Sequence, residues 1–513
     1  MTPRTPLLDI ELEGGPEGFD TPVYLRIARA VERDVRRGRL RPGDRMPGSR
    51  TLADALGVNR NTVVAAYREL EGVGWLTTTE ARGTFVSSSI AERPPRPIPR
   101  KGRAPRLPPT GIPEMPAFPL RAEEGRRASP RSESESGTAR VPGRTSLPLL
   151  GGIPDLRLAP WDAFARAHRR VVRTRAPAAF AYGDPRGAAS LRQALARMLR
   201  STRAVLADDD SLLVTRGTQM ALHLVSAELF AAGDAVAVEG FGYRPAWDTF
   251  RAAGADVVPV PLDEEGIDVH ALVRAHRERP FRAVYVTPHH QFPTTRPLSA
   301  ARRLALLAFA SDEKVAVIED DYDHEFHYDG RPIAPLASAD PAGVVVYVGT
   351  LSKVFAPGLR VGYVVAPKGL VARLVRRRVL VDRQGDHAGE AALADLMEDG
   401  TFDRHVGRVR RAYAERRSVL VAALAKTLGS ALTFTVPPGG TALWARASRG
   451  IDVDAWVRRA EDGGVRVHAG RRFAFDGRPR PFLRVGFAPL GPAEILEAVR
   501  RLGRSLGPIP GRS

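Results

Sequence analysis

The sequence contains no cysteine, and only five of its 513 residues are lysine. Without cysteine, neither a disulfide framework nor a thiolate metal site can form. The scarcity of lysine is informative because any chemistry that needs a lysine amine has few candidates. These candidates are Lys101, Lys314, Lys353, Lys368 and Lys426.

A long uninterrupted apolar run is also missing, so no segment is suited to span a bilayer as a helix. A secretory signal peptide would need an apolar stretch near the N-terminus, where this chain instead carries acidic residues. These are Asp9, Glu11, Glu13 and Glu17. Together the absences predict a cytoplasmic protein with no membrane partner.

The chain is long for one hydrophobic core, so we expect two or three domains. Its net charge is +19. A nucleic-acid partner would explain this charge, and so would a proteome generally rich in arginine. Part of the excess is local, because residues 21–88 carry twelve arginines against seven acidic residues.

Composition divides the chain into three regions. Residues 89–146 are rich in Pro, Arg and Ser and lack apolar periodicity, which predicts an extended linker. On either side we expect a small domain over residues 17–88 and a larger domain over residues 147–508. In the larger domain, short β-branched runs alternate with helical patterns, which is typical of a doubly wound α/β fold. The predicted buried strands are Ala235–Val238, Ala283–Val286, Val315–Ile318 and Val344–Val348.

The first region has the pattern of an α+β winged helix-turn-helix. Apolar residues at helical spacing predict a first helix, with Tyr24, Ile27, Ala28, Val31 and Val35 on its inner face. We expect Ser49 to cap a second helix that ends at Gly57, and Asn59 to cap a third. The third helix would bury Val63, Ala66, Tyr67 and Leu70. Strands at Trp75–Thr79 and Thr84–Val86, with Arg82 and Gly83 in the turn, would form the wing.

The third helix presents polar side chains suited to DNA. Arg and Asn can contact base edges in the major groove, and an arginine on the second helix can hold a phosphate. The candidates are Arg50, Asn59, Arg60, Asn61, Thr62 and Arg68. From periodicity alone, an ordinary polar surface helix remains an alternative.

The run MPGSRTLADALGVNRNTVVAAYRELEGVGWL, followed by GTFV, resembles the winged helix of the GntR family of bacterial regulators. The resemblance places Arg50, Arg60, Thr62 and Gly83 at family DNA-contact positions. It departs from the family pattern at Asn59, where Ser or Thr is usual, and at Val64. The resemblance therefore implies double-stranded operator DNA as a partner and leaves the operator sequence open.

The larger region contains the groups that pyridoxal 5'-phosphate requires, in which a lysine forms a Schiff base and an acid pairs with the pyridine nitrogen. A strand at Leu212–Val214 leads through Gly217, Thr218 and Gln219 into a helix, whose free N–H groups suit a phosphate. Tyr243 follows a later glycine turn and is a candidate to lie on the ring. A tyrosine in a loop of this kind often only packs against its neighbours, which is the alternative interpretation.

An apolar strand ends in Glu319-Asp320-Asp321-Tyr322, which places a carboxylate at the edge of the sheet. Asp320 would pair with the pyridine nitrogen and Tyr322 would contact the ring oxygen. The next residues also suggest a metal site, but no further ligand pattern completes one, so we expect no metal. We expect solvated loop charges at Asp323, His324, Glu325 and His327.

Lys353 follows the predicted strand Val344–Val348 and is the candidate for the Schiff base. Burial and a neighbouring cation would lower the pKa of its amine toward the neutral nucleophile. Ser352 and Arg360 would hold phosphate oxygens. Each motif alone is weak evidence for a pyridoxal phosphate site. The prediction depends on the order in which all of the motifs follow one another along the chain.

That order resembles fold-type I aminotransferases over about residues 151–502. AYGDPRGAASLRQALA, at residues 181–196, is similar to the segment near their substrate entrance. TPHHQFPTT, at residues 287–295, is similar to their Pro-Thr-Gly loop, with Phe292 in place of the usual Asn and Thr295 in place of Gly. The segment Phe482–Phe487 resembles the one whose arginine grips a carboxylate, which implies Arg484 for an effector or substrate carboxylate.

A GntR-like head, a long linker and an aminotransferase-like domain, together with the run HQFPT, identify the chain as a member of the MocR subfamily of regulators. The resemblance implies pyridoxal phosphate held as an aldimine on Lys353 and a head-to-tail homodimer. It also implies control of vitamin B6, amino-acid or amine metabolism genes, with pyridoxal phosphate or an amine as effector. The alternative is a working aminotransferase with an appended DNA-binding domain, because the catalytic groups are present.

Overall fold

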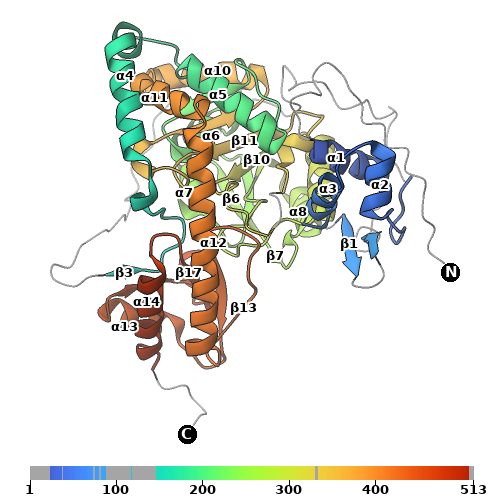
Figure 1. The fold of residues 1–513 in the computed structure, drawn as a ribbon, viewed down its shortest axis with the longest axis vertical. Helices are drawn as coiled ribbons and strands as arrows, with labels where there is room; N and C mark the ends of the chain where they lie inside the picture. The colour runs from blue at the N-terminus through green and yellow to red at the C-terminus, as the bar shows by residue number, and fades with distance from the viewer. Residues whose placement is uncertain are drawn as a thin grey trace.

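The structure is a computed structural model with a small head, a large domain built on a seven-stranded sheet, and a third body that contains a smaller sheet (Figure 1). No helix of the described chain is long and apolar enough to cross a membrane. The structure describes residues 23–36, 39–72, 75–79, 83–87, 117, 146–329 and 333–507.

The head is the predicted winged helix-turn-helix, drawn in blue in Figure 1. Three helices precede an antiparallel pair of strands in which Leu76 faces Val86. The apolar positions named from periodicity in the first and third helices form its core, with Ile27, Val31 and Val63 fully buried. The elements are α1 Val23–Arg36, α2 Ser49–Leu56, α3 Arg60–Gly72, β1 Leu76–Thr79 and β2 Gly83–Val86.

The ends of the helices follow the predictions in part. Gly57 ends α2 in the left-handed conformation, and Asn59 Oδ1 accepts a hydrogen bond from Asn61 N at 2.8 Å and so caps α3. The prediction that Ser49 caps α2 is wrong. Gly48 holds the N-cap position and Ser49 is the first helical residue, so its hydroxyl instead accepts from Arg60 Nε at 3.3 Å.

The large domain is built on a mostly parallel sheet in which only β12 runs antiparallel to its neighbours. Its strand order is β4-β12-β11-β10-β9-β5-β6, so the chain reverses direction across the sheet as doubly wound folds do. The five predicted strands of this sheet each begin or end one to three residues away from their predicted bounds. The strands are β4 Leu212–Thr215, β5 Ala235–Glu239, β6 Asp256–Val260, β9 Phe281–Val286, β10 Ala316–Asp321, β11 Val345–Thr350 and β12 Gly362–Val365.

Helices and apolar clusters cover both faces of this sheet, which explains why its strands are almost continuously apolar. A short antiparallel pair, β7 Leu262–Asp263 and β8 Gly266–Ile267, lies between two of the helices in sequence. The helices are α4 Trp161–Phe180, α5 Ala189–Met198, α6 Thr218–Leu229, α7 Arg244–Ala252, α8 Val269–Glu278, α9 Ala300–Glu313, α10 Lys368–Val381 and α11 His387–Glu398.

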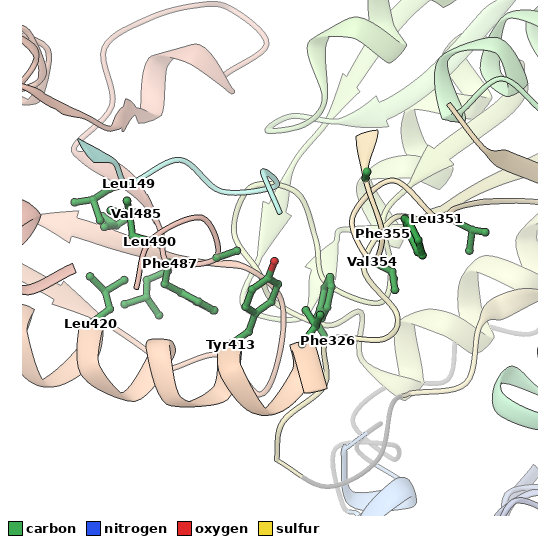
Figure 2. Packing of buried hydrophobic residues seen from close by; sticks show 14 of the residues in the cluster. Leu149, Phe326, Leu351, Val354, Phe355, Tyr413, Leu420, Val485, Phe487 and Leu490 are labelled. Atoms are coloured by element: carbon green, nitrogen blue, oxygen red, sulfur yellow. The ribbon is translucent and has the colours of Figure 1, made fainter. Parts of the chain in front are cut away.

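The long helix α12 (Thr401–Leu428) connects the large sheet to the third body (Figure 1). One apolar cluster is continuous across the boundary, from Leu149 and Val485 past Tyr413 to Phe326 and Phe355 (Figure 2). The third body contains β13 Leu432–Phe434, β14 Ala442–Ala447, β16 His468–Ala469, β17 Phe482–Gly486, α13 Val453–Asp462 and α14 Pro492–Arg504.

The chain enters the large domain through a short strand of this third body. β3 (Leu147–Pro148) pairs in parallel with β15 (Val465–Arg466). Most of the predicted linker lies outside the described residues, as do residues 17–22 and Arg82 of the predicted head. Ala117 is described, and its N–H donates to Gly343 O at 3.4 Å.

The head packs directly on the large domain of the same chain. Ala300 of α9 is buried in the apolar cluster of the head, and Leu304 packs against that cluster. Glu69 of α3 accepts a hydrogen bond from Ala334 N at 3.1 Å. The DNA-binding module is therefore in contact with the helix that follows the 287–295 loop.

Candidate cofactor pocket and DNA-binding helix

Lys353 lies in the turn after β11, where the ends of neighbouring strands meet. Burial lowers the pKa of its amine, and the nearby positive charge of Arg484 lowers it further, against the opposing effect of Asp320. A lower pKa increases the neutral fraction of the amine, the form that attacks an aldehyde. Burial and a cation thus both lower the pKa of this lysine, as expected from the sequence. Arg484 has a larger effect on this pKa than Arg360 has.

Asp320 occupies the end of β10, adjacent to β11 in the sheet. Its Oδ2 accepts a hydrogen bond from Tyr285 at 2.8 Å, whereas its buried Oδ1 has no partner among the described residues. Burial raises the pKa of this carboxyl to about 7. A protonated pyridine nitrogen would satisfy the free oxygen and favour the charged form, so this residue fits the cofactor.

The residues predicted to bind the phosphate come together at the ends of three strands that are neighbours in the sheet. Gly217 caps α6 with φ +79°, and a Cβ there would lie 2.8 Å from Arg360 Nη2. Arg360 Nη2 also donates to Arg216 O at 3.0 Å, and Ser352 is buried on the next turn. Thr218 begins α6, whose first N–H groups point out of the helix and suit an anion.

Gln219 is used differently from the prediction. Its amide nitrogen donates to Thr249 Oγ1 at 2.8 Å and to Pro245 O at 3.1 Å, both on α7. In this arrangement its side-chain donors hold one helix against another, and only its main-chain N–H remains for a phosphate.

Aromatic rings gather beside the lysine and the acid. Tyr243 and Phe292 meet edge to face with centroids 5.7 Å apart, and Phe292 meets Tyr322 at 5.9 Å. The hydroxyl of Tyr322 donates to His290 O at 3.0 Å, so it is engaged with the main chain rather than directed to a ring oxygen. Phe292 thus lies between the two tyrosine rings and meets both edge to face.

Thr295 explains why glycine is usual at its position. Its φ is +63°, in the left-handed region that a β-branched residue rarely adopts. Its N–H donates to Gln291 O at 2.6 Å, which closes the turn of the loop. The turn of the loop is therefore closed with a β-branched residue in the left-handed conformation.

Arg484 projects from β17 of the smaller sheet and is 1% exposed. Its guanidinium lies over the ring of Phe292, 4.5 Å from the centroid, and its Nε has no hydrogen-bond partner among the described residues. Gly151 packs so close to this guanidinium that any side chain there would collide with it, and a Cβ on Gly152 would lie 3.7 Å from Lys353 Nζ. A buried, partly unpaired guanidinium is suited to a carboxylate.

Sequence reasoning missed two residues of this pocket. Tyr285 donates a hydrogen bond to Asp320. Because Tyr285 lies inside an apolar strand, its sequence position indicates only a packing role. Glu239 ends β5 and accepts from the Thr287 hydroxyl at 2.9 Å, and burial raises its pKa to about 7. The acid at the end of an apolar strand was the available signal for Glu239.

The expectation of solvated charges after β10 is wrong. Asp323, His324 and His327 are each less than 5% exposed, and Glu325 is half-buried. The loop folds against the 287–295 loop, so that Asp323 Oδ1 lies 2.9 Å from His290 Nδ1. Neighbouring strands bring these two loops together, and spacing in the sequence does not reveal this.

The candidate DNA contacts lie on the open side of the head. Arg50, Asn59, Arg60 and Asn61 are exposed, and Thr62 is half-buried. Gly83 has φ +105° at the start of the second wing strand and is close to the Arg45 guanidinium. Arg68 is exposed farther along α3.

Comparison with known proteins agrees with both parts of the structure. Residues 23–86 match the model of bacterial regulatory proteins of the gntR family, and residues 152–502 match that of aminotransferase class I and II. A probable rhizopine catabolism regulatory protein, MocR, from Rhizobium meliloti is 30% identical over 94% of this chain and 93% of its own. The chain belongs to the MocR subfamily of GntR regulators. The HTH-type transcriptional regulator TauR from Rhodobacter capsulatus is 32% identical over 94% of this chain and 96% of its own.

The large domain of this MocR-type chain has the aminotransferase fold. The α-aminoadipate aminotransferase LysN from Thermus thermophilus, solved with N-(5'-phosphopyridoxyl)-L-leucine, has a TM-score of 0.66 and 30% identity, covering 71% of this chain and 92% of that one. A kynurenine aminotransferase from Pyrococcus horikoshii has a TM-score of 0.66 and 27% identity, covering 71% and 91%. The fold implies pyridoxal phosphate as the cofactor, and the head implies DNA binding.

Proposed function

We propose that this chain is a pyridoxal-phosphate-dependent transcriptional regulator that binds operator DNA through α3 and senses pyridoxal phosphate or an amine at Lys353. One observation carries the proposal. The same chain holds a half-buried lysine and a buried carboxylate that act on each other's pKa in an aminotransferase fold, and a recognition helix that begins with exposed Arg60 and Asn61 in a GntR head.

Each pocket residue has a proposed role. When bound, pyridoxal phosphate supplies an aldehyde that exchanges amines and a ring that withdraws electrons. Lys353 provides the amine that holds the cofactor and Asp320 provides the negative charge at the pyridine nitrogen. Arg484 binds the carboxylate of an amino-acid effector. The phosphate contacts are proposed for Gly217, Thr218, Gln219, Ser352 and Arg360. The ring contacts are proposed for Tyr243 and for Tyr322, whose hydroxyl would have to leave His290 O to reach the ring oxygen.

A buried arginine connects the pocket loop to the head, and we propose that it carries the signal. Arg303 of α9 donates to Pro288 O at 2.8 Å, to Leu298 O at 2.9 Å and to Ala334 O at 2.8 Å. Ala334 N in turn donates to Glu69 of α3. A ligand that binds more tightly to one conformation of the 287–295 loop than to another would shift the contacts from this loop through Arg303 to the head.

The head contacts DNA through exposed groups in this proposal. Arg60, Asn61 and Asn59 would approach base edges from the start of α3, with Thr62 beside them. Arg50 would hold a phosphate from α2, and Gly83 would let the wing approach the backbone.

The wider setting is also a proposal. Domains over residues 17–88 and 147–508, joined by a linker over 89–146, would assemble as a head-to-tail homodimer in the cytoplasm. The proposed targets are vitamin B6, amino-acid or amine metabolism genes, and the name of the Rhizobium relative, which refers to rhizopine catabolism, supports a metabolic target.

The test compares visible absorption and DNA binding of the wild type with those of Lys353→Ala, using Lys426→Ala on the exposed side of α12 as the matched control. We expect the absorption of lysine-bound cofactor in the wild type and the control, and none in Lys353→Ala. A candidate amine should change both the absorption and the affinity for operator DNA in the wild type. Absorption that survives in Lys353→Ala, or sustained transamination with no effect on DNA binding, would contradict the proposal.

A further inference from the structure

Four histidines from two loops meet behind the cofactor pocket. His289 and His290 belong to the 287–295 loop, and His324 and His327 follow β10. All four are buried, with exposed fractions of 1–4%. The ring of His289 lies 4.4 Å from that of His290 and 4.6 Å from that of His324, and the rings of His290 and His327 are 6.0 Å apart.

The polar atoms of this cluster are unusually short of partners. Both ring nitrogens of His289, Nε2 of His290, Nε2 of His324 and Nδ1 of His327 are buried without a hydrogen-bond partner among the described residues. Buried polar groups in proteins are normally satisfied, so a gathering of this kind points to an occupant.

Two of the histidines are oriented as metal ligands are. His290 Nδ1 lies 2.9 Å from Asp323 Oδ1, and His324 Nδ1 lies 3.0 Å from Asp321 Oδ2. A carboxylate on one ring nitrogen fixes the orientation of the imidazole and leaves the lone pair of the other nitrogen for a metal. In both residues the nitrogen left free is Nε2.

We propose that His289, His290 and His327 bind a divalent transition-metal ion of the zinc class. One ligand nitrogen from each lies within 4.8 Å of the other two, so the three form a group that could share one ion. A site made of imidazole nitrogens selects Zn²⁺, Co²⁺, Ni²⁺ or Cu²⁺ over Mg²⁺ and Ca²⁺, which prefer oxygen.

A second grouping shares His289 and adds Asp321 and His324. It is the weaker candidate because the Asp321 carboxylate already faces a cation, with Arg203 Nη1 3.7 Å from its Oδ2, although its Oδ1 has no hydrogen-bond partner among the described residues. The three-histidine group has no such competition at its free nitrogens. In the three-histidine site, His324 is not a ligand, and its ring stacks on that of His289.

The metal site lies on the other side of β10 from Asp320, although Asp323, which faces His290 Nδ1, also acts on the pKa of Lys353. Successive residues of a strand point to opposite faces, so Asp321 and Asp320 face opposite sides of β10. Asp320 faces Tyr285, whereas Asp321 faces Tyr347 and His324. The proposal therefore stands whether or not the chain senses an amine at Lys353.

The test titrates Zn²⁺ and Co²⁺ into full-length protein that has been stripped with a chelator. We expect one ion per chain and at least a tenfold loss of affinity in His289→Gln and in His327→Gln. The matched control is His270→Gln, an exposed histidine on α8, which should bind as the wild type does. Equal losses in the control, or undiminished binding in both cluster variants, would overturn the proposal.

A measurement on the wild type keeps the proposal testable if the variants fold poorly. X-ray absorption at the cobalt or zinc edge should show imidazole nitrogens in the first coordination shell of the protein-bound ion. A shell of oxygen atoms alone, or no stoichiometric ion after dialysis, would overturn it.

Discussion

The two functional regions of this molecule use polar residues in opposite environments. In the large domain, Lys353 and Asp320 lie close together out of water, and burial moves the pKa of each toward neutrality. In the head, Arg50, Arg60 and Asn61 are exposed to solvent. A pocket that carries out covalent chemistry needs altered acid strength, whereas a surface that reads DNA needs ordinary charges free to meet phosphates and bases. The regions should therefore fail in different ways when they are changed.

The largest expected effect is on stability without cofactor. The pKa of Asp320 rises from 3.8 to about 7 on folding, so between these values the folded state holds the proton that the unfolded state has lost. The contribution of Asp320 to the free energy of unfolding should therefore fall as pH rises from about 4 to 7, by up to about 1.4 kcal/mol per pH unit. Denaturant unfolding of the cofactor-free protein across this range measures it.

Asp320→Asn is the control for that pH dependence. The amide keeps the shape of the side chain and cannot ionise, so the variant should lose the part of the slope that Asp320 contributes. Glu239 has a similarly raised pKa and should leave a remaining slope. A slope that is unchanged in Asp320→Asn would show that the carboxyl is not neutral in the folded protein.

The second effect is on cofactor affinity. Asp320→Asn should weaken pyridoxal phosphate binding by about 10- to 100-fold, because a charge-assisted hydrogen bond of about 1.5–3 kcal/mol is lost. Equilibrium titration followed by visible absorption measures the change. Asp248→Asn, on the exposed side of α7, should bind as the wild type does. DNA binding without cofactor should stay the same, and a parallel loss there would break the contrast between the regions.

The third effect lies in the head. Arg60→Ala should weaken operator binding by about 1–3 kcal/mol, because a base or phosphate contact is removed from an exposed position. Fluorescence anisotropy at fixed salt measures this, with Arg166→Ala on α4 as a control that keeps the same net charge. The cofactor absorption of Arg60→Ala should match the wild type. An altered absorption would mean that the two regions are not separable.

The smallest effect concerns the contact between the regions. Glu69→Gln should cost about 1 kcal/mol, because the acceptor for Ala334 N is weakened. Faster hydrogen exchange in α3 would report it, whereas Asp54→Asn on the exposed side of α2 should leave exchange unchanged. Unchanged exchange in Glu69→Gln would locate the docking energy in the apolar contact with Ala300 instead.

The sequence predicted the elements and the strand-end positions of the pocket for physical reasons. Apolar periodicity reflects burial directly, and carboxyl ends of parallel strands meet at one edge, so Asp320 and Lys353 could be placed together. What the sequence did not reveal depends on contacts between separate loops. The engagement of Gln219 with α7, of Tyr322 with His290, and of Asp323 with that same histidine is set by the order of strands in the sheet.

The short strand β3 has a consequence for the reach of the DNA-binding head. β3 pairs with β15, and the chain then passes Gly151 and Gly152 against Arg484 and Lys353 before α4 begins. The C-terminal end of the linker over residues 89–146 is thus attached to the third body rather than to the large sheet. If that body closes on a carboxylate held by Arg484, the anchor point moves with it. Ligand binding would then shift the point at which the linker joins the third body, and with it the position from which the head can reach DNA.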